Sequence, residues 1–183
     1  SSNGVKEIVN IPEKVIASQL NTILNEFNID CIKIGLFNSY TSAISTISIL
    51  KKFKINVPIV IDPIYRSTSK TNFVKKEIYI KIHKVFAKLN PIFTPNIDEL
   101  KILLNLAESN DIDENLLIKK FYKKYRSNVI LTGVSKKGIY TTDYVLDESL
   151  KIKKISSKRI ISNNTHGSGC AFSSSLAIYL AMG

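Results

Sequence analysis

Apolar residues recur at three- and four-residue steps along much of the chain, a spacing typical of helices with one buried face. The first such stretch follows Pro12, which suits the first turn of a helix. Its apolar positions are Val15, Ile16, Leu20, Ile23, Leu24 and Phe27. A run of helix formers after Gly169 predicts a last helix. Similar patterns predict helices over residues 41–53, 71–89, 97–106 and 113–125.

Short, continuous apolar runs lie between these helices and predict strands over residues 31–36, 57–61, 91–94 and 129–132. Strands of this kind, alternating with helices, are typical of a parallel sheet that is covered on both faces. Residues 138–142 and 150–155 predict two shorter strands around a turn, which suits an antiparallel pair at the sheet edge. The sequence therefore predicts an α/β fold of three layers, with a mostly parallel central sheet, helices on both faces and antiparallel edge strands.

The length and composition favour a single folded domain. The chain has 183 residues, 44% of them apolar and 9% aromatic, and no internal repeat or Gly/Ser-rich linker divides it. No apolar stretch is long enough to cross a bilayer, and Glu7, Glu13 and Glu26 do not fit a signal peptide. We therefore expect one domain over residues 1–183, located in the cytoplasm. Cys31 and Cys170 match no zinc or disulfide spacing and are expected to be reduced thiols.

The net charge of +11 raises the question of nucleic-acid binding. The lysines, however, are scattered along the chain in pairs, such as Lys51-Lys52 and Lys119-Lys120, and show no basic stripe with aromatic or base-reading partners. The chain is also rich in Ile, Asn and Lys, the amino acids of AT-rich codons, which accounts for much of the charge. We therefore expect no nucleic-acid partner and no membrane partner.

A glycine turn precedes the last predicted helix. Gly167 and Gly169 bracket Ser168, so backbone N–H groups can converge at the helix start, an arrangement that holds phosphate oxygens. Cys170 lies on the same helix start, where the helix dipole can lower a thiol pKa and make it a base, a nucleophile or a covalent handle for a carbonyl. The alternative is a plain tight turn in which Cys170 is a small buried side chain.

Polar residues follow three of the predicted strands. Asp62 follows the second strand, Thr94 and Asn96 follow the third, and Thr132 ends the fourth. Ligands of open parallel sheets bind beyond the carboxyl ends of the strands, so these residues could form one rim of the kind that a magnesium–nucleotide site uses. Asn96 and Glu99 also have the spacing of a capping box, and the structural and functional interpretations are compatible.

The sequence Thr165-His166-Gly167-Ser168-Gly169-Cys170 closely resembles the signature of hydroxymethylpyrimidine and hydroxymethylpyrimidine-phosphate kinases, the thiamine-pathway branch of the ribokinase-like superfamily. In most of that superfamily the last position is an aspartate that acts as a base, whereas this branch has a cysteine. Three further motifs resemble the family and occur in its order along the chain. They are Lys33-Ile34-Gly35-Leu36, Asp62-Pro63, and Thr94-Pro95-Asn96 with Glu99.

The resemblance implies ATP- and Mg²⁺-dependent phosphorylation of hydroxymethylpyrimidine, of its monophosphate, or of both. In this interpretation Cys170 assists deprotonation of the substrate hydroxyl or positions it, and the amides of residues 167–169 contact the transferring phosphoryl group. Gly35 lies near the substrate pocket. The magnesium side of the site consists of Asn96, Glu99 and Asp62. The remaining nucleotide-binding candidates are Thr94, Thr132, Thr165 and His166.

The same resemblance leaves alternatives open. Some enzymes of this branch act on vitamin B6, so pyridoxal is a second candidate substrate. The expected assembly is a homodimer. Two departures from the family favour a third reading, a catalytically impaired remnant that acts only as a binding or scaffold protein. The family's first strand and Gly-Ser-Asp segment have no counterpart, and Thr132 stands where relatives usually carry a lysine. We therefore expect a domain truncated at its N-terminus and lacking the usual closing helix.

His83, the second histidine, lies in a lysine-rich predicted helix, and we expect it to be solvated on the surface.

Overall fold

A computed structural model describes residues 6–67, 71–107, 112–134, 138–147, 149–162 and 167–183. Within this part of the chain, six strands form one sheet in which the spatial order of the strands follows the sequence. The first four strands are parallel and the last two are antiparallel. They are β1 (Ile32–Ile34), β2 (Ile59–Ile61), β3 (Ile92–Phe93), β4 (Asn128–Leu131), β5 (Tyr140–Leu146) and β6 (Ile152–Lys158).

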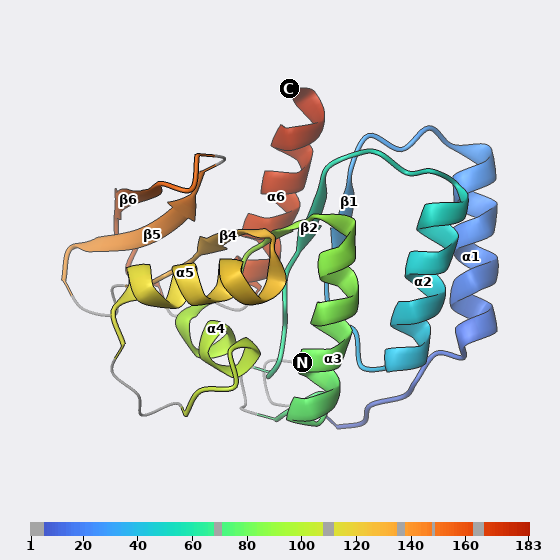
Figure 1. The fold of residues 1–183 in the computed structure, drawn as a ribbon, viewed down its shortest axis with the longest axis horizontal. Coiled ribbons are helices and arrows are strands. Elements are labelled where there is room, and N and C mark those ends of the chain that lie inside the picture. The colour runs from blue at the N-terminus through green and yellow to red at the C-terminus, as the bar shows by residue number, and fades with distance from the viewer. Residues whose placement is uncertain (1–5, 68–70, 108–111, 135–137, 148, 163–166) are drawn as a thin grey trace.

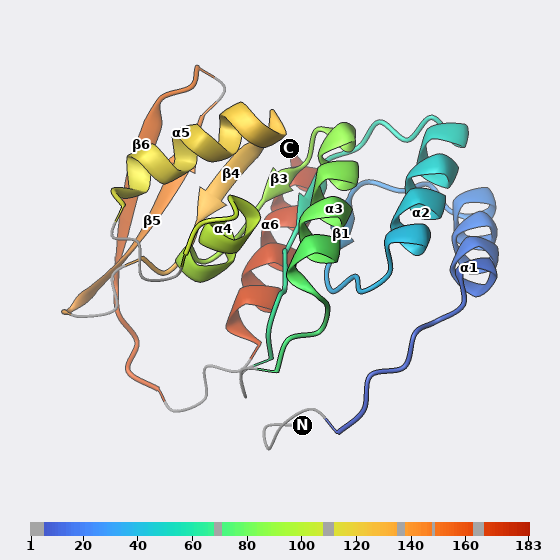
Figure 2. The same ribbon diagram turned by 60° about the horizontal axis from the view of Figure 1, so that its bottom comes forward.

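The helices cover both faces of this sheet, as the sequence predicted (Figure 1). In Figure 1 α3 lies in front of the strands and α6 lies behind them, and the turned view in Figure 2 keeps the two helices on opposite sides. The predicted α/β architecture with a mostly parallel sheet and antiparallel edge strands is confirmed. The helices are α1 (Glu13–Glu26), α2 (Tyr40–Lys52), α3 (Lys76–Phe86, continued by a 3₁₀ turn at Ala87–Leu89), α4 (Ile97–Leu103), α5 (Glu114–Tyr125) and α6 (Ser168–Met182).

The core lies between the sheet and the helices α3 and α5. Phe93 of β3 is fully buried, and its ring centroid lies 5.2 Å from that of Phe121 and 5.9 Å from that of Tyr125, both on α5. From α3, Ile82 and Phe86 are fully buried as well. These large side chains come from the apolar stripes that the three- and four-residue spacing predicted.

His83 is buried with this core, so the expectation of a solvated surface histidine is wrong. Only 3% of the residue is exposed, its Nδ1 lies 2.8 Å from the backbone oxygen of Tyr79, and its ring centroid lies 6.1 Å from that of Phe93. Burial lowers the pKa of His83 to about 4. The lysines of α3 occupy the outer face of the helix, while His83 shares the inner face with Ile82 and Phe86.

Two predicted boundaries also need correction. Residues 71–75 were expected to be helical, but Asn72 pairs with Arg66 in an isolated antiparallel bridge, and α3 begins only at Lys76. The strands β5 and β6 are longer than predicted, because each continues for seven residues in one antiparallel ladder from Tyr140 opposite Lys158 to Leu146 opposite Ile152. Cross-strand pairing extends these strands beyond the apolar run that the sequence shows.

The described residues contain no helix that is both long enough and apolar enough to cross a bilayer.

Candidate active site

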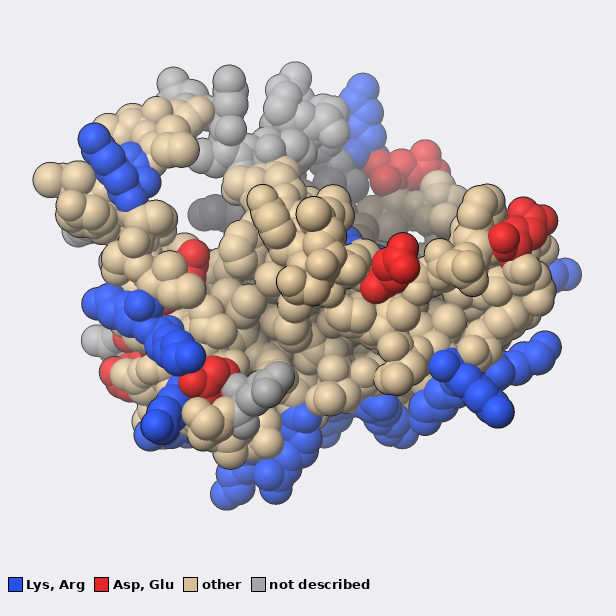
Figure 3. Space-filling model, turned by 90° about the horizontal axis from the view of Figure 1, so that it is seen from above, with Lys and Arg blue, Asp and Glu red and all other residues tan. Residues whose placement is uncertain are grey.

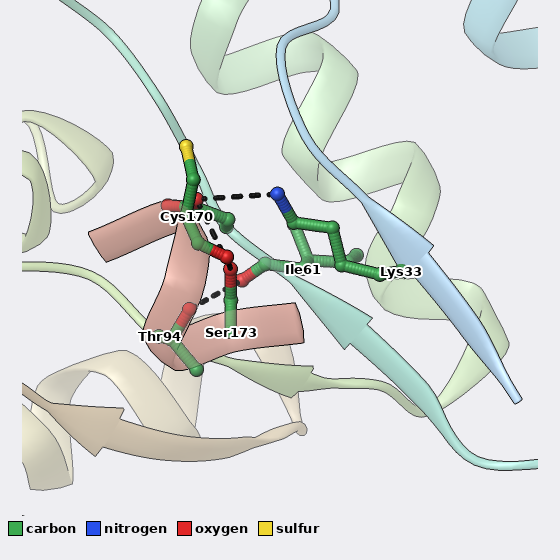
Figure 4. A network of polar contacts seen from close by, with 6 residues as sticks. Lys33, Ile61, Thr94, Cys170 and Ser173 are labelled. Atoms are coloured by element: carbon green, nitrogen blue, oxygen red, sulfur yellow. Dashed lines mark hydrogen bonds and ion pairs between the residues drawn. The ribbon is translucent and has the colours of Figure 1, made fainter. Parts of the chain in front are cut away.

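Asp62 lies at the carboxyl end of β2, at the centre of the candidate site. Its backbone N–H donates to the backbone oxygen of Ile34 over 2.9 Å, which ties the ends of β1 and β2 together. The residue is only 5% exposed. Its Oδ2 lies 3.5 Å from Nζ of Lys33 and accepts a hydrogen bond of 3.2 Å from Oγ of Ser173 (Figure 4). A carboxylate from β2 is thus held by side chains from β1 and α6.

The start of α6 lies beside this carboxylate. Gly167 is the N-cap residue, with a φ of +80° that glycine adopts without strain, as the predicted glycine turn requires. No side chain of the described residues caps this helix. A Cβ added at Gly167 or Gly169 would meet no described atom within 4 Å. Without a side-chain cap among the described residues, the N–H groups of the first helical turn suit an anion.

Cys170 lies on the first turn of α6 and is half-buried. Its pKa is raised, first by burial and then by the hydrogen bond and the charge of Asp62, while the positive charge of Lys33 acts in the opposite direction. Burial, the largest cause, and the Asp62 carboxylate thus act against the lowering of the thiol pKa that the sequence predicted from the helix start. The raised pKa favours a protonated thiol at neutral pH, which donates a hydrogen bond.

The end of β3 supplies the next polar groups. Thr94 is buried, and both its N–H and its hydroxyl donate to the backbone oxygen of Ile61, over 2.9 and 3.3 Å (Figure 4). Asn96 is the N-cap of α4, where its Oδ1 accepts from the N–H of Glu99 over 2.9 Å and its own N–H donates to Oε2 of Glu99 over 3.0 Å. The capping box is thus confirmed.

Glu99 has a second property that a cap does not require. Burial raises the pKa of Glu99 to about 7, the hydrogen bond from Asn96 lowers it, and the charge of Asp62 raises it. The two carboxylates therefore lie close enough to repel each other. A bound cation would relieve this repulsion, because it favours the charged form of both groups.

Thr132 follows β4 and faces the same end of the sheet. It forms an isolated parallel bridge with Asn96, and its N–H and hydroxyl donate to the backbone oxygen of Pro95 over 2.9 and 3.3 Å. The structure therefore brings Asp62, Thr94, Asn96 and Thr132 to the carboxyl edge, as their positions after consecutive parallel strands predicted. The hydroxyl of Thr132 already donates to the backbone oxygen of Pro95, and the Thr132 side chain carries no charge.

Gly35 has a specific neighbour at this edge. A Cβ added at Gly35 would lie 3.3 Å from Nζ of Lys33, tighter than nearly all real Cβ contacts. Gly35 thus leaves the space that the Lys33 ammonium occupies. Thr165 and His166 lie outside the described residues.

Sequence reasoning missed Lys33 and Ser173. Both had a signal. Lys33 is a charged residue in an otherwise apolar strand and lies two residues before Gly35. Ser173 follows Cys170 by three residues, which places Cys170 and Ser173 on one side of a helix.

Two carboxylates at this rim suit Mg²⁺ better than a transition metal. The described residues include no group of three His, Cys, Asp or Glu side chains that could hold a metal ion alone. Magnesium is usually bound by one or two carboxylates together with water and substrate phosphates, so Asp62 and Glu99 fit an ion that arrives with a nucleotide.

A cavity of about 470 Å³ is lined by Leu36 and Phe37, which follow β1 and Gly35 in the chain. Most of its lining is apolar, with polar groups from Asn38 and Ser42, which suits a small ring with a few hydrogen-bonding groups. The other lining residues are Glu7, Ile8, Val9, Ile11, Ile16 and Phe73.

This fold, with an uncapped helix start and two carboxylates at the carboxyl edge of its sheet, places the chain in the class of ribokinase-like phosphotransferases. Within that class the chain belongs to the phosphomethylpyrimidine kinase family, whose sequence model matches residues 1–183.

Individual relatives agree with this family. The chain is 30% identical over 181 residues to the hydroxymethylpyrimidine/phosphomethylpyrimidine kinase of Aquifex aeolicus, an alignment that covers 98% of this chain and 70% of that protein. It is 26% identical over 183 residues to the thiamine biosynthesis bifunctional protein ThiED of Geobacter sulfurreducens. That alignment covers all of this chain but only 37% of the relative, so the chain spans little more than a third of that protein's length.

Solved structures of two kinds resemble the fold. An ADP complex of Bacillus subtilis pyridoxal kinase matches with a TM-score of 0.81 and 25% identity, covering 97% of this chain and 66% of that one. A phosphomethylpyrimidine kinase of Clostridium difficile matches with a TM-score of 0.79 and 23% identity, covering all of this chain and 74% of that one. The second likeness concerns the fold alone.

Proposed function

We propose that this chain carries the phosphotransferase site of an enzyme that phosphorylates hydroxymethylpyrimidine, its monophosphate, or both, with magnesium-ATP as donor. The observation that carries the proposal is the meeting of Asp62, Cys170 and the uncapped start of α6 at one point. Phosphoryl transfer is chiefly a matter of positioning and of stabilising charge, and these groups supply both.

In the proposed reaction the acceptor oxygen, which is the hydroxyl of hydroxymethylpyrimidine or a phosphate oxygen of its monophosphate, forms a bond to the γ-phosphorus while the bond from that phosphorus to the leaving ADP oxygen breaks. The amides of residues 167–169 stabilise the negative charge on the phosphoryl oxygens, as donors at a helix start do. A magnesium ion brought in with the nucleotide would offset further charge between the phosphates, held by Asp62 and Glu99.

Cys170 has the role of a positioning donor in this scheme. Its raised pKa argues against a thiolate base at neutral pH. The thiol can instead hold the acceptor oxygen towards the phosphorus, and a proton released from a hydroxyl acceptor passes to water. The cavity lined by Leu36 and Phe37 is the proposed place of the pyrimidine ring.

Pyridoxal is the second candidate acceptor. The likeness to the pyridoxal kinase of Bacillus subtilis supports it, because the TM-score and identity are at least as high there as for the phosphomethylpyrimidine kinase of Clostridium difficile. The neutral Thr132, with its hydroxyl bound to Pro95, supports a slow or inactive enzyme, the third possibility that the sequence left open.

The test is phosphoryl transfer by the purified 183-residue chain from magnesium-ATP to hydroxymethylpyrimidine, hydroxymethylpyrimidine phosphate and pyridoxal, measured in parallel by mass spectrometry of the products. We expect turnover with a pyrimidine, and a fall of about 100-fold or more in kcat/KM for Cys170→Ala, in the range found for positioned groups in proton transfer. Cys31→Ala is the matched control and should keep the activity. Turnover with pyridoxal alone would replace the proposed substrate, and absence of turnover from a folded chain would reject the kinase activity.

A further inference from the structure

Asp62 is held from two directions at a single oxygen. The ammonium of Lys33 approaches Oδ2 to 3.5 Å from β1, and the hydroxyl of Ser173 donates to the same oxygen over 3.2 Å from α6 (Figure 4). The Ser173 hydroxyl lies in addition 3.0 Å from the backbone oxygen of Cys170, which links the contact to the first turn of the helix. Lys33 and Ser173 both contact Oδ2, and the Cys170 thiol also hydrogen bonds to this carboxylate.

The position of the ammonium is itself shaped by the chain. The side chain of Lys33 is 23% exposed and that of Asp62 7%, so this pair is far drier than a surface salt bridge. The missing side chain at Gly35 leaves the space for Nζ, which would lie 3.3 Å from a Cβ at that position.

We propose that Lys33 is a positioning residue for Asp62, which with Ser173 holds Oδ2 and orients the carboxylate to bind a divalent cation. A Cβ at Gly35 would lie 3.3 Å from Nζ of Lys33 and would therefore shift the ammonium slightly. The inference deepens the proposed function and rests on it, since a kinase of this class needs a cation beside its phosphates.

The test measures Mn²⁺ binding to the 183-residue chain in the presence of ADP, from the paramagnetic resonance signal of free Mn²⁺. Lys33→Met should weaken Mn²⁺ binding about tenfold or more, the usual effect of removing a group that orients a metal ligand. Lys33→Arg should restore most of the affinity because it keeps the charge. Gly35→Ala should give an intermediate loss, because it displaces the ammonium without removing it. Lys81→Met, on the exposed face of α3, is the matched control and should bind as the unmodified chain does.

A double-mutant cycle separates positioning from general damage to the site. In the Asp62→Asn background Lys33→Met should cause no further loss, because there is no carboxylate left to position. The double variant Lys33→Met/Asp62→Asn leaves neither charge of this pair without its partner, so it should fold, which urea unfolding checks. Losses that add in the cycle, an unchanged affinity in Lys33→Met, or no Mn²⁺ binding by the unmodified chain would each overturn the proposal.

The two proposals fail in different ways. If Mn²⁺ binding depends on Lys33 but no acceptor is phosphorylated, the kinase activity is rejected and the positioning role stands. If an acceptor is phosphorylated and Lys33→Met changes neither Mn²⁺ binding nor the metal concentration at half-maximal rate, the positioning role is rejected and the kinase activity stands.

Discussion

Individual residues at the site have different surroundings from those that their neighbours in sequence suggest. Cys170 starts a helix, yet its thiol pKa is raised, first by burial and then by Asp62, while Lys33 acts in the opposite direction. His83 lies among lysines in the sequence, yet it packs against Phe93, and burial lowers its pKa. In both cases burial, which the neighbouring sequence does not show, is the first cause of the shift.

His83 should make the fold sensitive to acid. Its pKa is about 4 in the folded chain and near 6.5 when unfolded, so below pH 6.5 the unfolded state binds a proton more readily. The contribution of His83 to the free energy of unfolding is therefore complete above pH 6.5 and falls as the pH drops towards 4, by at most about 1.4 kcal/mol per pH unit.

Glu99 acts in the opposite sense. Its pKa is raised to about 7 in the folded chain, so its contribution to the free energy of unfolding is lost as the pH rises from 4.5 through 7.

A comparison of variants isolates the contribution of His83. Urea unfolding of the unmodified chain and of His83→Leu between pH 4.5 and 8 should show a smaller loss of stability at low pH in the variant. If the free energy of unfolding changed equally with pH in the two proteins, His83 would not titrate as its burial requires.

At the level of elements, the start of α4 depends both on local sequence and on contacts between distant segments. The capping box of α4 needs only Asn96 and Glu99, which are three residues apart, and it was visible in the sequence. The burial of Glu99 near Asp62 needs β2 and β3 to be neighbours, which no local pattern shows.

The cap of α5 gives a test of purely local stabilisation. Oδ1 of Asp113 accepts from the N–H of Leu116 over 3.1 Å. Asp113→Ala should destabilise the chain by about 1 kcal/mol, while Asp113→Asn, which keeps the acceptor, should lose only a fraction of that. Thermal or urea unfolding of both variants measures the difference. A similar loss in both would mean that the charge of Asp113, rather than the cap, is the stabilising feature.

At the level of the whole molecule, charge and apolar surface are distributed unevenly. Seen from above, lysine and arginine side chains gather along the edge of the molecule that is lowest in Figure 3. The helix α6 is apolar in composition, yet only Ser173 and Ala177 are buried, and Tyr179 is 72% exposed together with Ile178 and Met182. An apolar helix with so much exposed surface favours association.

The expected homodimer remains a prediction that this surface supports. Light scattering after size-exclusion chromatography should give a mass above the 20.5 kDa of one chain, and the mass should rise with concentration. The double change Ile178→Asn and Tyr179→Ser should shift the protein towards the monomer. Lys81→Met, far from this helix in sequence, is the control. A concentration-independent monomer would contradict the prediction.

The sequence alone determined the order and type of the elements, the parallel sheet, the glycine turn and the polar residues after three of the strands. These features depend on neighbouring residues: apolar spacing sets helices and strands, and the residue after a strand is fixed by where the apolar run ends. The start of α3 and the length of β5 and β6 were not determined in this way, because bridges such as Arg66 with Asn72 join residues through space.

Only the tertiary structure decided how the polar residues act on one another. The contact of Lys33 and Ser173 with Asp62, the space that Gly35 leaves, the raised pKa values of Cys170 and Glu99 and the burial of His83 all arise between distant segments. Burial and Coulomb interactions depend on distance in space rather than in sequence, so residue types indicated the class of chemistry, while packing set the charge and orientation of each group.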